Sequence, residues 1–137
     1  MMMTMKQTCI GTVVSMTLFG VALLSAPAVA GPDFADIDAD LMRGMEDAIK
    51  NLEPVLGAGN LTSAQADAEV LRDGLKWTEE YFVAKGGVDD GVTIARQGRA
   101  VVDELLAHLN AKDVPAAIEA ARNTAKNCRS CHDIYKP

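Results

Sequence analysis

The chain has 137 residues, 49% hydrophobic and 23% charged, as expected of one small globular domain. Its 13 Lys and Arg residues against 19 Asp and Glu give a net charge of −6, which argues against binding to nucleic acid or to an anionic membrane surface. The same acidity predicts protein partners that present basic patches.

Residues 1–30 are predicted to be a secretory signal peptide. Lys6 is the only charged residue, an apolar stretch follows it, and Ala28-Val29-Ala30 has the small-residue pattern of a cleavage site. The alternative, a membrane anchor, is disfavoured because polar residues and a glycine interrupt the apolar stretch. We expect cleavage after Ala30, which leaves a periplasmic protein with no membrane anchor and a single domain of residues 31–137.

Four segments of this domain show the 3.6-residue hydrophobic periodicity of amphipathic helices. The first begins near Asp36 or Asp38, each a suitable N-cap, and runs toward Leu52, with Pro54 expected to kink or end it. Its apolar stripe comprises Leu41, Met42, Met45, Ala48, Ile49, Leu52 and Leu56.

The other three helices are bounded by cap and turn residues. The capping box Thr62-Ser63-Ala64-Gln65 opens the second helix and Gly86-Gly87 stops it, whereas Asp89-Asp90 caps the third. The fourth opens at Asp113-Val114-Pro115, and one of its faces holds Val114, Ile118, Ala121, Ala125, Cys128, His132 and Tyr135.

Short loops between these four helices predict an all-α fold, an antiparallel up-down-up-down four-helix bundle. A domain of this size has a marginal core, so a large apolar cofactor would add substantially to what it buries.

The end of the fourth helix carries Cys128-Arg129-Ser130-Cys131-His132, the C-x-x-C-H signature of covalent c-type haem attachment. Two thiols one helical turn apart can each form a thioether with a porphyrin vinyl group, and the histidine lies on the same side of the helix. Cys128 and Cys131 are therefore predicted to attach one haem c near the C-terminus of the fourth helix, with His132 as proximal iron ligand.

A redox dithiol and half of a zinc site are the alternatives for this motif. A dithiol motif is typical of a strand–helix context, and no segment of the domain has strand periodicity. A zinc site needs two further ligands, and His108 is the one other soft donor of residues 31–137.

A haem motif on the last of four helices resembles the class II c-type cytochromes, the cytochrome c′ family. The resemblance spans residues 31–137, and its specific part runs from Cys128 to Lys136, where two residues, an aromatic and a base follow the haem motif. It implies one of two functions: gas binding at a five-coordinate iron, or electron transfer at a low-spin iron that a methionine of the first helix also ligates.

The distal ligand is expected from the first helix. An antiparallel bundle places the haem at the end that holds the start of this helix, where Met42 and Met45 lie. Matching Ile49-Lys50-Asn51-Leu52 to the family's pattern places Met42 at the distal position, with Met45 as the second choice. Alternatively, both methionines are ordinary core residues. His108 is expected roughly 24 Å from the haem motif along the bundle, too far to ligate iron.

The resemblance also suggests residues around the haem. The family often has an arginine near a haem propionate, but this chain has Asp38 at that position, which leaves Arg99 as the candidate for propionate pairing, ahead of Arg43 and Arg96. Thr78, Tyr81 and Phe82, at the haem end of the second helix, are expected to wall the pocket. Trp77, with Tyr81 and Val70, is a candidate homodimer face, since many family members dimerise through their first two helices; the alternative is that these side chains pack against the neighbouring helix.

Together these patterns predict a periplasmic one-electron carrier with a low-spin His/Met haem. The chain shows no acid–base pair, free nucleophile or open metal site beyond the haem, so it is not expected to be an enzyme. The alternative is a five-coordinate protein that binds NO or CO, which requires both methionines to turn away from the iron.

Overall fold

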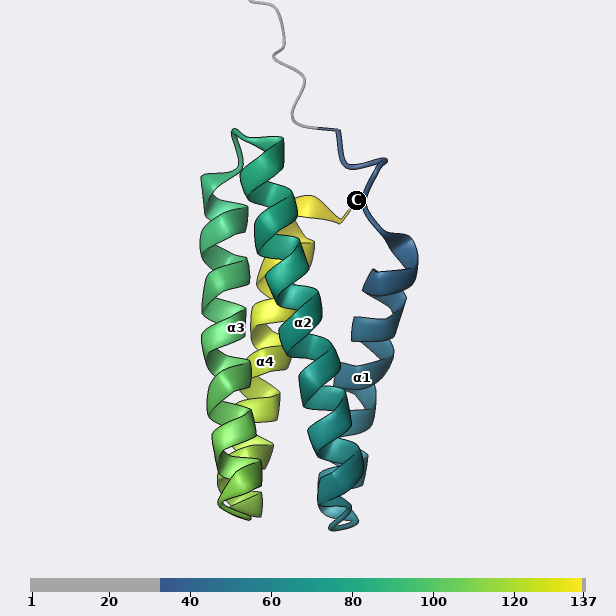
Figure 1. The fold of residues 1–137 in the computed structure, drawn as a ribbon, viewed down its shortest axis with the longest axis vertical. Helices are drawn as coiled ribbons and strands as arrows, with labels where there is room; N and C mark the ends of the chain where they lie inside the picture. Colours follow the sequence, from purple (N-terminus) through teal and green to yellow (C-terminus); the bar gives the residue numbers. More distant parts are fainter. Residues whose placement is uncertain (1–32, 137) are drawn as a thin grey trace, which may run out of the picture. The chain divides into compact units, whose positions relative to one another are not determined.

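The computed structural model describes residues 33–136, which form four α-helices and no strand. These are α1 (Ala39–Gly57), α2 (Leu61–Lys85), α3 (Asp89–Asn110) and α4 (Val114–Tyr135), shown in Figure 1. The predicted all-α class is confirmed for this part of the chain, and the four helices are consistent with a four-helix bundle. The predicted signal peptide and its cleavage site lie outside the described residues.

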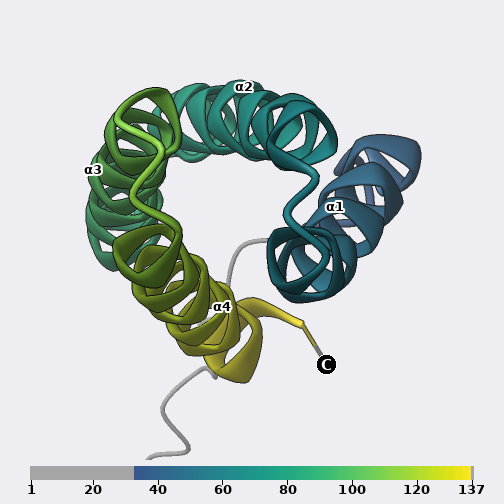
Figure 2. The same cartoon turned by 90° about the horizontal axis from the view of Figure 1, so that it is seen from below.

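Each helix packs against two neighbours around a common interior (Figure 2). α2 contacts α1 and α3, and α4 contacts α3 and α1. Polar side chains join every pair: Asn51 to Asp67 at 2.7 Å, Arg96 to Glu79 at 3.0 Å, Asn127 to the carbonyl of Ile94 at 3.1 Å, and Arg122 to Glu53 at 2.8 Å. Within residues 33–136, no helix is both long enough and apolar enough to span a bilayer.

The N-caps of α1 and α4 are as predicted. The Asp38 carboxylate accepts from the amides of Asp40 and Leu41 at 3.0 and 2.9 Å, and Asp113 accepts from the amide of Ala116 at 3.2 Å. Both caps are local features, because a short carboxylate satisfies amide donors two or three residues along the chain.

The predicted starts of α2 and α3 need correction. Asn60 caps α2, accepting from the amide of Ser63 at 3.1 Å, so Thr62 lies inside the first turn and does not act as the cap. In α3 the N-cap position is held by Val88, whose side chain accepts no hydrogen bond from the helix. Asp89 and Asp90, which were expected to cap the helix, lie in its first turn. There the carboxylates still interact favourably with the helix dipole.

Pro54 does not end the first helix, which continues to Gly57. A proline removes one amide donor, and this loss is tolerated because Pro54 lies in the last turn on the exposed side. Gly59 then adopts a φ of 73° in the turn to α2, a conformation that favours glycine.

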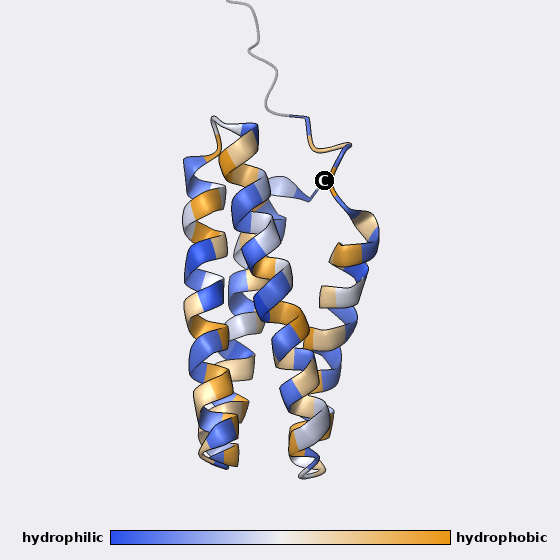
Figure 3. Ribbon diagram, in the orientation of Figure 1, coloured by the Kyte–Doolittle hydropathy of each residue, from blue (hydrophilic) through white to orange (hydrophobic). Residues whose placement is uncertain are grey.

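The core is built from the apolar stripes of the four helices, which alternate with polar residues along each helix (Figure 3). In α2 the buried residues recur every three or four positions: Ala64, Ala68, Leu71, Gly74, Leu75, Thr78 and Phe82. The predicted face of α4 is rotated, however, and the buried residues of this helix are Ala117, Ala120, Ala121 and Thr124. Cys128 and Tyr135 are half-buried beside that face, whereas His132 is exposed.

Candidate cofactor site

A cavity of about 1030 Å³ lies among the four helices, at the end of the domain where α1 begins and α4 ends. Its lining is mainly apolar and includes Ile37, Met42, Met45, Ile49, Leu75, Phe82, Ile94, Ala95 and Ala125. Small-molecule and cofactor sites typically measure about 300–1,000 Å³ and are lined by apolar side chains with a few polar groups. This cavity is therefore large enough for a flat, apolar cofactor.

The C-x-x-C-H motif occupies the last turns of α4 and borders this cavity. Cys128, Cys131 and His132 all line it; both cysteines are half-buried and free, and His132 is exposed. Helical spacing brings the two thiols and the imidazole to one side of α4, as the predicted chemistry requires.

Neither thiol is activated by its surroundings. Burial raises the pKa of the Cys128 thiol above its ordinary value of 9.0. Burial, and after it the negative charges of Cys128 and Asp90, raises the pKa of Cys131 to about 11. Redox-active cysteines have lowered pKa values, so these surroundings disfavour the dithiol alternative.

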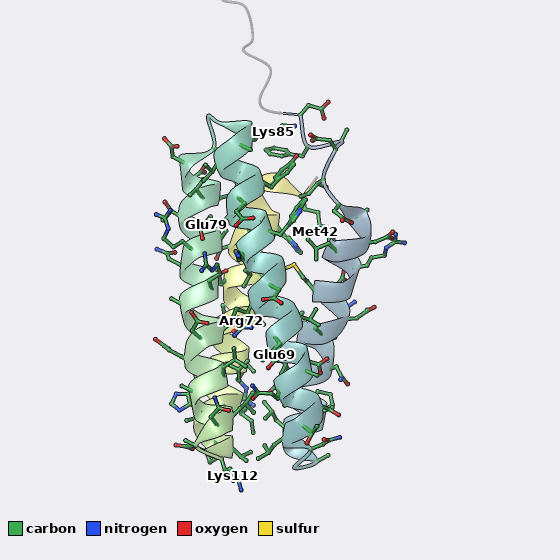
Figure 4. All side chains as sticks on the ribbon, in the orientation of Figure 1. Met42, Glu69, Arg72, Glu79, Lys85 and Lys112 are labelled. Carbon is green, nitrogen blue, oxygen red and sulfur yellow. The ribbon has the colours of Figure 1, made fainter. Side chains whose placement is uncertain are left out.

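Both methionines of α1 border the same cavity but differ in their packing. Met42 is half-buried on the side of α1 that faces the other helices (Figure 4). Met45, one turn further on, is only 8% exposed and belongs to the core cluster. The structure thus brings both candidate distal ligands to the cavity of His132.

Of the three expected pocket-wall residues of α2, Thr78 and Phe82 line the cavity and Tyr81 does not. Phe82 is buried and borders it. Tyr81 lies outside the lining; its hydroxyl donates to a carboxylate oxygen of Asp36 at 2.6 Å. Thr78, one turn before Phe82, does border the cavity, but its hydroxyl donates to the carbonyl of Gly74 at 2.8 Å.

Arg99 is not brought to the cavity. Its guanidinium pairs with Glu79 of α2 at 2.6 Å, and Arg96 holds the other oxygen of that carboxylate at 3.0 Å (Glu79 is labelled in Figure 4). The hydrogen bond from Arg99 lowers the pKa of Glu79. Desolvation raises this pKa by less, and the hydrogen bond from Arg96 lowers it further. Among the cationic side chains, Arg43, Arg129 and Lys136 border the cavity instead. His108 lies in the last turn of α3, outside the lining.

Sequence reasoning missed the segment before α1, which lines one end of the cavity. Phe34 stacks edge-on against Tyr135 and Phe82, with ring centroids 5.3 and 5.9 Å apart. The Asp36 carboxylate binds this segment to α2. It accepts one hydrogen bond from the Tyr81 hydroxyl at 2.6 Å and one from Lys85 Nζ at 2.7 Å. Phe34 lies four residues before the N-cap Asp38, so the hydrophobic-staple pattern, which uses the residue directly before the cap, does not identify it.

The donor set fits a haem held covalently and does not form a bare metal site. Within residues 33–136, no group of three or more His, Cys, Asp and Glu side chains is placed to hold a metal ion. A porphyrin supplies its own four nitrogen ligands, so one histidine and one thioether beside two thiols suffice.

No family model, curated protein or solved structure matches this chain.

Proposed function

We propose that residues 31–137 form a periplasmic c-type cytochrome that carries single electrons. The observation that supports this proposal is that the two thiols, the imidazole and a thioether, on helices at opposite ends of the sequence, line one apolar cavity of about 1030 Å³.

Cys128 and Cys131 would form the two thioether bonds, and His132 would be the proximal iron ligand. Contacts at this end of the domain support this assignment: Phe34 packs on Tyr135, and Lys136 Nζ lies 3.8 Å from the Glu46 carboxylate, so the end of α4 meets the start of α1. When bound, the haem iron supplies the one-electron chemistry, and the protein sets its ligands and surroundings.

Met42 is the proposed distal ligand, with Met45 as the second choice. Met42 is half-buried at the border of the cavity, so its side chain has room to turn toward a cofactor. Ligation by His and Met in both oxidation states means that little rearranges when the electron moves, which suits a carrier.

The surroundings of the site favour the reduced state. The α2 wall consists of Leu75, Thr78 and Phe82, and the Thr78 hydroxyl is already committed to a backbone carbonyl. An apolar wall and a thioether ligand stabilise the lower charge of ferrous iron and raise the reduction potential.

The remaining assignments are part of the same proposal. The protein acts as a carrier and not as an enzyme, is exported with cleavage after Ala30, and has no membrane anchor. Its acidity favours redox partners with basic patches, and the α2 face of Trp77, Tyr81 and Val70 is the candidate homodimer face. There the rings of Trp77 and Tyr81 stack 5.1 Å apart, and Val70 is exposed.

The experiment that tests this proposal is spectroscopy of the exported protein. We expect its mass to exceed that of the polypeptide by one haem, its ferric and ferrous spectra to be low-spin, and carbon monoxide to leave the ferrous spectrum unchanged. A high-spin spectrum that shifts with carbon monoxide would support the gas-binding alternative. A colourless protein with two titratable thiols would refute haem attachment altogether.

A further inference from the structure

The thioether of Met45 occupies a slot that exists because residue 74 has no side chain. A Cβ atom on Gly74 would lie 2.3 Å from Met45 Sδ and 2.6 Å from its Cγ. Both separations are far shorter than the ~3.5–4.0 Å at which carbon atoms attract each other. Met45 and Gly74 are both buried, so the contact lies in the interior between α1 and α2.

The backbone at Gly74 does not explain the glycine. Gly74 lies in the middle of α2 and is not among the glycines with positive φ. A glycine in a helix interior is destabilising relative to alanine. The close approach of Met45 is the compensating reason, since glycine permits contacts that any Cβ atom would block.

The turn of α2 that holds the slot is also fixed by a side chain. The Thr78 hydroxyl donates to the Gly74 carbonyl at 2.8 Å in a buried position. Thr78 lines the cavity, so the slot and the cavity wall are adjacent parts of one helix.

We propose that Gly74 is a positioning residue that decides which methionine ligates the iron. By seating the Met45 thioether between α1 and α2, at the edge of the cavity, Gly74 turns it away from the cofactor and leaves Met42 as the distal ligand. The inference rests on the proposed function, because the two thioethers compete only if a haem occupies the cavity. Gly74 itself touches neither the iron nor the porphyrin in this scheme.

A rescue experiment on the exported haem protein tests the inference. Met42→Ala leaves Met45 in its slot, so the ferric spectrum should become high-spin. Adding Gly74→Ala fills the slot with a methyl group and displaces the thioether, which is flexible and has the neighbouring cavity to enter. The pair of substitutions should therefore restore a low-spin spectrum, and adding Met45→Leu should remove it again.

Gly44→Ala is the matched control for this series. Gly44 is also an interior residue of a helix, but no atom lies within 4 Å of the Cβ that alanine would add. Combined with Met42→Ala, it should leave the spectrum high-spin, which separates the slot from a general effect of alanine on helix stability.

Each other outcome has a distinct meaning. If Met42→Ala with Gly74→Ala stays high-spin while the parent carries a low-spin haem, the inference is wrong and the proposed function stands. If Met42→Ala alone stays low-spin through Met45, Gly74 does not hold Met45 and the inference is again wrong. If the parent binds no haem, the proposed function fails first.

A second measurement does not depend on the iron. Met42 and Met45 are the only methionines from residue 31 onward, so methyl-¹³C-methionine labelling of the exported protein should give two methyl signals. The Met45 methyl should show a nuclear Overhauser effect to the α protons of Gly74, and Gly74→Ala should shift this signal while Gly44→Ala does not. An unshifted Met45 signal in Gly74→Ala would overturn the inference whatever the spin state.

Discussion

Asn127 donates a hydrogen bond from its side-chain amide to the backbone carbonyl of Ile94, 3.1 Å away on α3. Its amide oxygen lies over Gly98, where a Cβ atom would come within 2.3 Å of it. Asn127 directly precedes Cys128 and itself lines the cavity. Cys128, the first of the two proposed attachment cysteines, therefore follows a residue that is bonded to α3, and that contact needs a glycine at position 98.

Gly98→Ala should destabilise the protein through this contact. The added methyl group would meet Asn127 Oδ1 at 2.3 Å and Leu75 Cδ2 at 3.1 Å. Overpacking costs about 1–3 kcal/mol, and the better helix propensity of alanine offsets up to about 1 kcal/mol of that. We expect the free energy of unfolding in urea to fall by about 1–2 kcal/mol.

Two further variants show whether this loss comes from the contact. Gly44→Ala, which meets no neighbouring atom, should raise the free energy of unfolding by about 0.5–1 kcal/mol. Asn127→Ala should lose about 1 kcal/mol alone but relieve the clash when combined with Gly98→Ala. Strict additivity of the two substitutions would show that they do not act on each other.

Asp36→Asn should change how stability depends on pH. The hydrogen bond from Lys85, and after it that from Tyr81, lowers the pKa of Asp36 below 3.8, and the bond to Asp36 raises the pKa of Lys85 above 10.5. The carboxylate therefore contributes stability above pH 3.8 that is lost as pH falls through its lowered pKa. The ammonium contributes stability below pH 10.5 that is lost as pH rises through its raised pKa.

The difference in melting temperature between the parent and Asp36→Asn should thus be largest between pH 3.8 and 10.0 and should shrink on both sides, because burial raises the pKa of Tyr81, the other donor to Asp36, from 10.0, and its contribution is lost with that of Lys85 at high pH. Asp33→Asn is the control in the same segment, because the Asp33 carboxylate accepts from the amide of Ala35, a bond that asparagine can keep. A pH-independent difference for Asp36→Asn would mean that the segment before α1 is not held by charge.

The helices themselves could be predicted from the sequence because their signals are local. Asp38 and Asp113 act as caps through hydrogen bonds to amides three positions further along the chain, so both caps depend on neighbouring residues alone. The start of α2 was predicted two residues too late, because Asn60 and Thr62 are both suitable N-cap residues. The turn at Gly59 ends directly before Asn60, which selects the earlier of the two.

The rotation of α4 could not be predicted, because its first half offers too little contrast. Adjacent alanines at 116–117 and 120–121 give neighbouring faces the same hydrophobicity, so packing against α3 and α1 decides which of them is buried. The partners of Asp36, Glu79 and Phe34 were missed for a different reason. Their partners lie on other helices, far along the chain, and no local sequence pattern predicts such long-range contacts.

Arg99→Gln should reduce stability without changing the haem. Arg99 pairs with Glu79, whose side chain is 14% exposed, and lies outside the cavity lining. We expect a loss of about 1 kcal/mol in the free energy of unfolding, as for a partly buried charged hydrogen bond. The absorption spectrum and the reduction potential should remain those of the parent. A clear change in potential would instead support pairing of Arg99 with a haem propionate.

Arg96→Gln is the matched control, since Arg96 holds the same carboxylate but its side chain is 67% exposed. Solvent weakens such a pair, so its loss should cost less than that of Arg99. Equal losses would indicate that burial of the Arg99 side chain adds nothing to the pair.

Cys128→Ser combined with Cys131→Ser should yield a chain that does not form a stable, cooperative bundle. Without covalent attachment the haem is lost, and apolar walls such as Leu75, Phe82 and Ile94 then face a cavity of about 1030 Å³. Apolar side chains that face water in this space lose the burial that stabilises the fold, and small domains are stable by only about 5–15 kcal/mol.

The measurement is near- and far-ultraviolet circular dichroism during urea unfolding. The double variant should retain part of its helical signal, lose its near-ultraviolet signal and unfold without a sharp transition. Ser130→Ala is the control within the motif, because Ser130 is exposed, lies outside the cavity lining and donates to the carbonyl of Lys126. It should keep both haem and cooperativity. A double variant that unfolds as sharply as Ser130→Ala would mean that the four helices close the cavity with their own side chains, and that the cofactor is not needed for the core.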